Sequence, residues 1–130
     1  AINRQLVGQG VSRQSFGLHS RILEADEFVA NRPEGVIEVH PELSFATMAG
    51  TPLAHGKRTW VGARRRRELL RESGIVLDEV GPEVGPARVD DVLDAAAAAW
   101  TARRRDRGTA GANPQPPQVF SDGISCAIWA

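Results

Sequence analysis

The sequence predicts one soluble domain of the α/β class, residues 1–130, in which helices pack beside a small sheet. Residues 35–40 (GVIEVH) are β-branched and alternate like a strand, whereas residues 21–31 and 88–106 repeat apolar side chains at helical spacing. The length of 130 residues lets one core bury on the order of two-thirds of the unfolded surface. Balanced charge, with 16 Lys and Arg against 16 Asp and Glu, and a hydrophobic content of 42% are typical of such domains.

Composition excludes several classes of protein. The single cysteine, Cys126, cannot form an internal disulfide, so a secreted disulfide scaffold is excluded and the cytoplasm is the expected compartment. Every apolar run falls short of the roughly 18 residues of a membrane span, and residues 1–20 lack the pattern of a signal peptide, so we expect no membrane partner. Zero net charge excludes a protein that is basic all over, although 15 of the 16 cations are Arg and cluster.

The first third of the chain predicts two helices and a strand. Residues 1–10 are expected to be the end of a helix that two glycines stop. Ser20 is the predicted N-cap of a helix over residues 21–31, which the following Arg-Pro-Glu-Gly string breaks. Residues 35–40 then form the strand.

The middle third predicts two further helices. Pro41 suits the first position of a helix and Gly50 suits its end, so we expect a helix between them. Thr59 is the predicted cap of a helix that runs to about Ser73 and carries a run of arginines. Residues 75–77 are a candidate short strand.

The longest predicted helix, residues 88–106, has two unequal faces. Its core-facing stripe consists of Val89, Val92, Leu93, Ala96 and Trp100. The opposite face holds only Ala and Asp, namely Asp91, Asp94, Ala95 and Ala98. Because a face of alanine lets another backbone approach closely, we expect this helix to be buried on both sides. Residues 108–117 are then predicted as a linker-like loop, and residues 119–129 as a hairpin that turns at Ser121-Asp122-Gly123.

The first candidate site is the group Glu38, His40 and Glu42 at the end of the predicted strand. An unpaired carboxylate in a half-buried strand is costly, so Glu38 needs a cation, a hydrogen-bond network or a wet cleft. The alternative is that Glu38 faces solvent on an edge strand and Glu42 complements the dipole of a helix N-terminus. His40 by itself is more typical of a hydrogen-bonded structural residue.

The second candidate site is the group Asp90, Asp91 and Asp94. Two carboxylates three residues apart on one helical face can share a divalent cation such as Mg²⁺, which prefers oxygen ligands. Alternatively, aspartates in a first helical turn complement the helix dipole, which explains Asp90 and Asp91 fully. Asp94 is less well explained, since it lies in the second turn, where Asp is a poor helix former.

The third candidate is the arginine run at residues 64–67. Four successive residues point all round a helix, and Glu68 and Glu72 are available as ion-pair partners, so a solvated face is one interpretation. The other is that Arg64, Arg67 and Arg71 contact phosphates from one side. The spacing of His55, Lys57 and Cys126 indicates neither a zinc site nor a thiol nucleophile.

The strings VIEVHPELSF, PLAHGKRTWVGARRRRELL, VDDVLDAAAAAW and IWA occur in this order. In wording and order they resemble a bacterial and archaeal family of unknown function predicted to be RNase H-like nucleases. The resemblance reaches back to the segment NRQLVGQGVSRQSFGLHSRILEAD and so covers most of the chain. It implies an RNase H-like fold, with a mixed sheet and flanking helices.

The resemblance also implies a metal-dependent phosphodiesterase. Glu38, Asp91 and Asp94 would be catalytic, and together with Glu42 they would bind Mg²⁺ or Mn²⁺, which would activate water and stabilise the leaving oxygen. A further set of residues would bind the nucleic acid substrate, namely His40, Lys57, Arg64 and Arg67.

The chain departs from the RNase H-like pattern at its start. The Ile-x-Asp-Gly string of the first strand and the Asp before a Pro-x-Gly string are both missing from the sequence. We therefore expect the later part of a longer domain, without the N-terminal strands and with weak or no nuclease activity. Two other roles fit the same scaffold: a non-catalytic module that binds protein or nucleic acid, and a homo-oligomer in which a second copy covers an exposed sheet edge.

Overall fold

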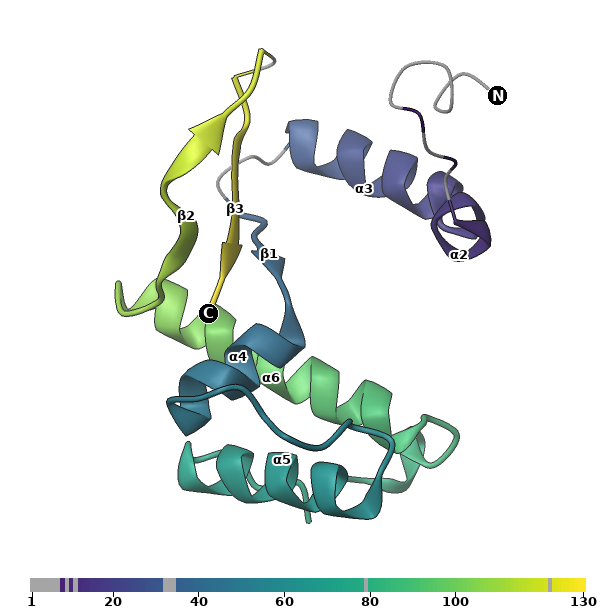
Figure 1. Ribbon diagram of the computed structural model, residues 1–130, viewed down its shortest axis with the longest axis vertical. Helices are drawn as coiled ribbons and strands as arrows, with labels where there is room; N and C mark the ends of the chain where they lie inside the picture. Colours follow the sequence, from purple (N-terminus) through teal and green to yellow (C-terminus); the bar gives the residue numbers. More distant parts are fainter. Residues whose placement is uncertain (1–7, 9, 11, 32–34, 79, 122) are drawn as a thin grey trace. The chain divides into compact units, whose positions relative to one another are not determined.

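The computed structural model of the chain describes residues 8, 10, 12–31, 35–78, 80–121 and 123–130 (Figure 1). The chain divides into two compact units, residues 1–36 and 37–130. The second unit combines helices with a mixed sheet, which confirms the predicted α/β class. The predicted helix end at residues 1–10 lies almost wholly outside the described residues.

The first unit contains two helices, α2 (Arg13–Gly17) and α3 (His19–Asn31). The ring of His19 stacks on that of Phe16, with 5.4 Å between the ring centroids, where the two helices meet. Because α3 begins at His19, Ser20 lies inside the helix, and its prediction as the N-cap was wrong.

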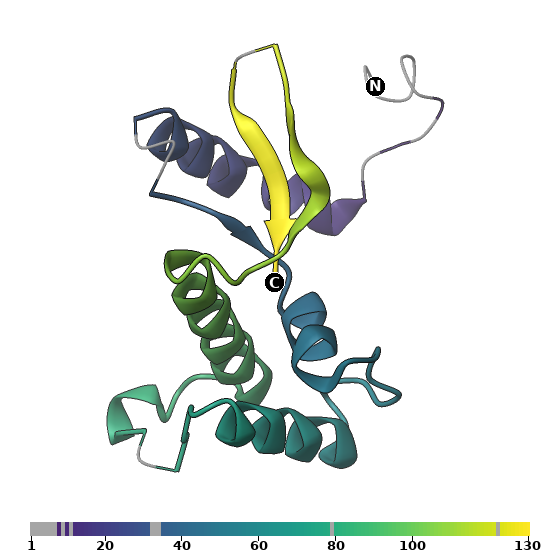
Figure 2. The same ribbon diagram turned by 90° about the vertical axis from the view of Figure 1, so that its left-hand side faces the viewer.

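The sheet of the second unit has the strand order β1-β3-β2 in the described part of the chain. Its strands are β1 (Glu38–Val39), β2 (Ala112–Val119) and β3 (Ser125–Trp129). The central strand β3 pairs in parallel with β1 and antiparallel with β2 (Figure 2). The predicted strand at residues 35–40 is thus only two residues long, because β3 ends opposite Val39 and Pro41 begins a helix.

The strand β2 takes up residues 112–117 of the loop predicted for residues 108–117, so the prediction holds for residues 108–111 and was wrong for the rest. Its three prolines lie between Asn113 and Gln118, where the pairing with β3 shifts register. Prolines are tolerated there because β2 is an edge strand, whose outward N–H groups need no partner strand. The hairpin predicted for residues 119–129 is confirmed as the end of the β2–β3 pair.

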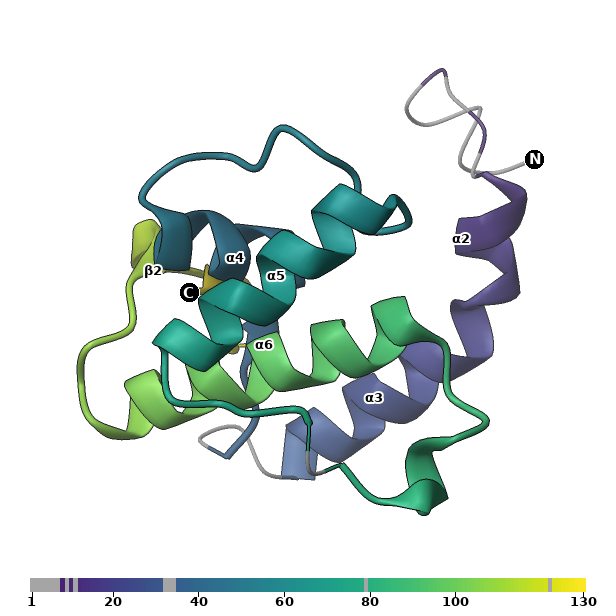
Figure 3. The ribbon, with the colours of Figure 1, turned by 90° about the horizontal axis from the view of Figure 1, so that it is seen from below.

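Three helices lie at the carboxyl end of β1 and β3 (Figures 1 and 3). They are α4 (Pro41–Ala49), α5 (Trp60–Glu72) and α6 (Val89–Asp106), and a short 3₁₀ turn, Pro82–Val84, precedes the last of them. The predicted ends of α4 and α5 are confirmed: Gly50 closes α4 in the left-handed conformation at φ 69°, and the Thr59 hydroxyl accepts a hydrogen bond from the Gly62 N–H. The candidate strand at residues 75–77 is not formed.

The hydrophobic core lies between these three helices. It consists of Phe45, Leu69, Leu70, Leu93, Ala96 and Ala97. The small side chains of α6 let α4 approach closely enough for the buried hydroxyls of Ser44 and Thr101 to form a hydrogen bond of 2.8 Å. Of the helices in the described segments, none combines the length and apolar character that crossing a membrane requires.

The faces of α6 differ from the prediction in two respects. Leu93, Ala96 and Trp100 of the expected stripe are buried, but Val89 is 62% exposed at the start of the helix. The expected second buried face is also wrong, because Asp91 and Ala95 are exposed. Both α4 and α5 contact α6, and the side that they cover includes Asp90, Ala97 and Thr101 instead.

Candidate functional site

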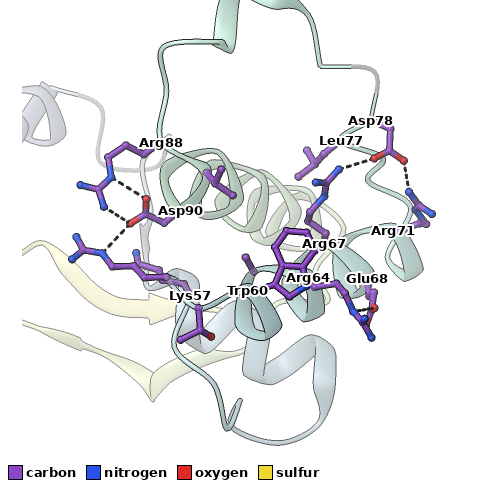
Figure 4. A pocket seen from close by; sticks show the side chains of 14 residues that line it. Lys57, Trp60, Arg64, Arg67, Glu68, Arg71, Leu77, Asp78, Arg88 and Asp90 are labelled. Atoms are coloured by element: carbon purple, nitrogen blue, oxygen red, sulfur yellow. Dashed lines mark hydrogen bonds and ion pairs between the residues drawn. The ribbon is translucent and has the colours of Figure 1, made fainter.

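A pocket of about 890 Å³ opens beside α5, the start of α6 and the connection between them (Figure 4). Pockets of this size are large enough for a small ligand or a few units of a polymer. The described residues that line it include six cationic side chains, Lys57, Arg58, Arg64, Arg67, Arg71 and Arg88. Three acidic side chains of the described residues line it as well, Glu68, Asp78 and Asp90. The lining is therefore cationic in a chain whose net charge is zero.

Each of the three lining carboxylates is shared by two arginines, and Glu68 pairs with Arg64 at 3.0 Å and with Arg65 at 3.6 Å. Asp78 accepts a hydrogen bond of 2.8 Å from Arg67 and a second one from Arg71. Figure 4 shows these two guanidinium groups converging on Asp78 at one side of the pocket. One negative charge thus orients two positive charges, and a net positive charge remains beside it.

Asp90 has the same arrangement at the other side of the pocket. It is 8% exposed and pairs with Arg88 at 3.1 Å and with Arg58 at 3.5 Å. Burial acts to raise the pKa of Asp90, but the hydrogen bonds and positive charges of Arg88 and Arg58 outweigh it, and the pKa lies below its usual 3.8. Asp90 is therefore a fixed anion that holds two arginines at the pocket.

Lys57 and Asp94 form an ion pair deeper between the loop and α6. The Lys57 ammonium donates a hydrogen bond to Oδ2 of Asp94, whereas the buried Oδ1 has no hydrogen-bond partner among the described residues. This hydrogen bond raises the pKa of Lys57 above its usual 10.5 against the opposing effect of burial, and the negative charges of Asp94, Asp90 and Glu42 raise it further. Lys57 is thus paired with Asp94 and lies in the field of two further carboxylates.

Glu42, predicted to bind metal, is held by Arg66 instead of being free in a cleft. The Arg66 side chain is 1% exposed and donates to both oxygens of Glu42, at 2.5 and 3.3 Å. It also donates to the carbonyl oxygens of His55 and Gly62 at 3.0 and 2.9 Å, and its guanidinium lies over the ring of Phe45. Arg66 is thus a structural cation that ties α4 to α5 and to the loop before it.

The loop that carries Lys57 packs directly against the backbone of α5. Gly62 is buried, and a β-carbon at this position would lie 2.8 Å from the carbonyl oxygen of His55 and would overlap that of Gly56. Only glycine permits this approach. The Thr59 hydroxyl adds a hydrogen bond of 2.8 Å to the Gly56 carbonyl, so the loop and the first turn of α5 form one rigid unit.

The remaining predicted site residues lie apart from these ion pairs. Glu38 is exposed on the edge strand β1, His40 is exposed at the N-cap of α4, and Asp91 is exposed on α6. In the described ranges, no three His, Cys, Asp or Glu side chains lie close enough together to hold a metal ion. The prediction that Glu38, Glu42, Asp91 and Asp94 bind Mg²⁺ or Mn²⁺ stays a prediction.

Sequence reasoning did not single out Arg58, Trp60, Asp78 or Arg88 of the pocket, and it misjudged Asp90 and Arg66. Asp90 was explained as a dipole-complementing residue, although its four-residue spacing from Asp94 places both on one face of α6. Arg66 was hidden in a run of four identical residues, where composition gives no sign of which one is buried.

A comparison with protein families identifies the relatives of the chain. A family described as "Protein of unknown function (DUF429)" matches residues 1–119. The chain belongs to the DUF429 family. No curated protein and no solved structure matches it.

The DUF429 match includes the whole lining of the pocket and the Lys57–Asp94 and Glu42–Arg66 pairs. It ends at the last residue of β2, before β3 begins. The description of the family names no activity. The nuclease activity that the sequence resemblance implies is therefore still a prediction.

Proposed function

We propose that this DUF429 protein binds nucleic acid through its phosphates in the pocket beside α5. The observation that carries this proposal is the sharing of one carboxylate by two arginines at each side of the pocket. Guanidinium groups bind phosphate oxygens with two parallel hydrogen bonds, and oriented groups lose less freedom when they bind. Asp78 and Asp90 provide that orientation without cancelling the positive charge.

The start of α5 supports the proposal. Thr59 and Trp60 bring the first turn of this helix to the pocket, and the positive end of a helix dipole favours anions. A nucleic acid presents phosphates at regular intervals, so several of them can contact the arginines that line the pocket, among them Arg64, Arg67 and Arg88.

The test is a binding assay with fluorescently labelled oligonucleotides over a range of salt concentrations. The variants Arg64→Ala and Arg67→Ala should each weaken binding and reduce the slope of log affinity against log salt by about 0.7 for each lost phosphate contact. Arg65→Ala is the matched control, since Arg65 belongs to the same run but is not among the lining residues; it pairs with Glu72 and, together with Arg64, with Glu68.

Three outcomes are informative. Equal effects of the Arg64, Arg65 and Arg67 substitutions would contradict binding in the pocket, as would binding that does not depend on salt. If a mononucleotide competes as well as an oligonucleotide of about 12 nucleotides, the natural partner is a small phosphorylated ligand and not a polymer.

A metal-dependent phosphodiesterase is the second candidate function, favoured by the buried, unpartnered Oδ1 of Asp94. The other predicted ligands fit a divalent cation poorly as they lie, because Arg66 holds Glu42 while Glu38 and Asp91 are exposed. Titration with Mn²⁺ tests the idea, since a metal that binds only the folded protein raises the midpoint of thermal unfolding. The proposal requires a rise that Asp94→Asn abolishes, and an unchanged midpoint counts against it.

A further inference from the structure

The aromatic side chain of Trp60 is the most exposed large apolar group in the described part of the chain. It is 81% exposed at the first position of α5 and lines the cationic pocket. In Figure 4 its indole lies between the arginines at Asp78 and the arginine at Asp90. Val89, 62% exposed, extends this apolar surface at the start of α6.

The backbone that carries Trp60 is held firmly. The preceding residue, Thr59, accepts the Gly62 N–H at 3.1 Å and donates to the Gly56 carbonyl at 2.8 Å. The close packing of Gly62 on the loop fixes the same turn from its other side. The backbone that presents the indole is therefore rigid, so binding need not order the loop or the first turn of α5.

An exposed indole among cations has a specific chemical partner. Phosphates alone would be bound by the arginines, and the indole would add nothing. An unpaired base has an aromatic face that can stack on the indole while its neighbouring phosphates reach the arginines. In a duplex both faces of each base are already stacked, and only the phosphates are available.

We propose that Trp60 is a stacking platform for an unpaired base, through which the pocket selects single-stranded nucleic acid over duplex. The inference rests on the proposed function, since it requires that nucleic acid binds in the pocket. It goes further by assigning the discrimination to Trp60 and the sequence-independent affinity to the arginines.

The experiment compares oligothymidine of about 12 nucleotides with a duplex of the same length, both labelled, at one salt concentration. Trp60→Ala should weaken binding of the single strand at least about fivefold and leave the duplex unchanged, because stacking on one aromatic side chain contributes at least that much. Trp60→Phe should retain most of the affinity for the single strand. Val61→Ala is the control, an exposed apolar neighbour outside this pocket that should alter neither affinity.

The outcomes separate this inference from the proposed function. If Arg64→Ala and Arg67→Ala weaken binding but Trp60→Ala does not, or if Trp60→Ala weakens single strand and duplex equally, the stacking role is wrong and phosphate binding stands. If none of the three substitutions alters the affinity, both proposals are wrong. Thermal unfolding of each variant verifies that it is folded, and Trp60→Ala should be as stable as the wild-type protein because its side chain is exposed.

Discussion

Replacing the buried Arg66 by alanine should destabilise the protein more than any other substitution in the arginine run. The substitution removes four hydrogen bonds, two to the Glu42 carboxylate and one each to the carbonyl oxygens of His55 and Gly62. It also removes the contact between the guanidinium and the ring of Phe45. Glu42 then has no cationic partner, and a cavity opens beside Phe45.

The magnitude follows from the burial of the two partners. Breaking a fully buried ion pair by removing one partner costs about 3–5 kcal/mol. The Glu42 side chain is 40% exposed and can recover part of its hydration, so we expect the lower end of this range, about 3 kcal/mol of unfolding free energy. The double variant Arg66→Met, Glu42→Leu should recover part of the loss, because it leaves no unpaired charge.

The assay is equilibrium unfolding in urea, with Arg65→Ala as the matched control. Arg65 precedes Arg66 on the same helix, but it is 42% exposed and its ion pairs measure 3.3 and 3.6 Å, so its loss should cost only about 0–1 kcal/mol. A cost for Arg66→Ala that lies within about 1 kcal/mol of the control would refute the structural role of Arg66.

Three other substitutions test the packing and the electrostatics, each by urea unfolding. Gly62→Ala should cost about 1–3 kcal/mol or displace the loop, because a β-carbon would overlap the Gly56 carbonyl. Ser44→Ala should cost about 1–3 kcal/mol, since it leaves the buried hydroxyl of Thr101 without its 2.8 Å partner. The pKa of Asp90 is lowered by folding, so this group stabilises the protein above pH 3.8 and the contribution is lost as the pH falls below that value. Asp90→Asn should therefore reduce stability at neutral pH and make the decline toward pH 3 less steep.

Each of these predictions has its own contradicting result. Gly56→Ala is the control for Gly62, because its β-carbon would meet open space, and equal effects of the two would contradict the close approach. Thr47→Ala removes an exposed hydroxyl from the same helix as Ser44, and a cost as large as that of Ser44→Ala would contradict the buried hydrogen bond. An Asp90→Asn variant with the acid dependence of the wild-type protein would show that Arg58 and Arg88 do not hold the pKa down.

The helices of the second unit could be predicted from local chemistry. Thr59, Pro41 and Gly50 define helix ends through their own hydroxyl, ring or missing side chain, and such effects need no partner from elsewhere in the chain. The strand β2 could not be predicted in this way. Its segment is rich in proline, and it is a strand only because β3, which follows it in the chain, supplies the hydrogen bonds.

Only part of the candidate site could be predicted from the sequence, because the burial of its residues also depends on partners from other elements. The pattern of acidic residues on α6 indicated carboxylates that face other parts of the chain, but a single helix does not reveal which side its neighbours cover. The structure turns Asp90 and Asp94 toward the loop with Lys57 and leaves Asp91 exposed. The partner elements thus determine which member of the Asp90-Asp91 pair is buried.

In the arginine run, too, the neighbouring elements determine the partner of each charged side chain. Successive helical residues point about 100° apart, so the four arginines at residues 64–67 do not share one environment. Arg66 enters the core, Arg65 pairs along the helix surface, and Arg67 reaches Asp78 at the pocket. The total charge of zero hides this division. A neutral chain can present a positive surface because two arginines share each carboxylate that is described at the pocket. The field that a ligand meets thus depends on how charges are partnered rather than on their number.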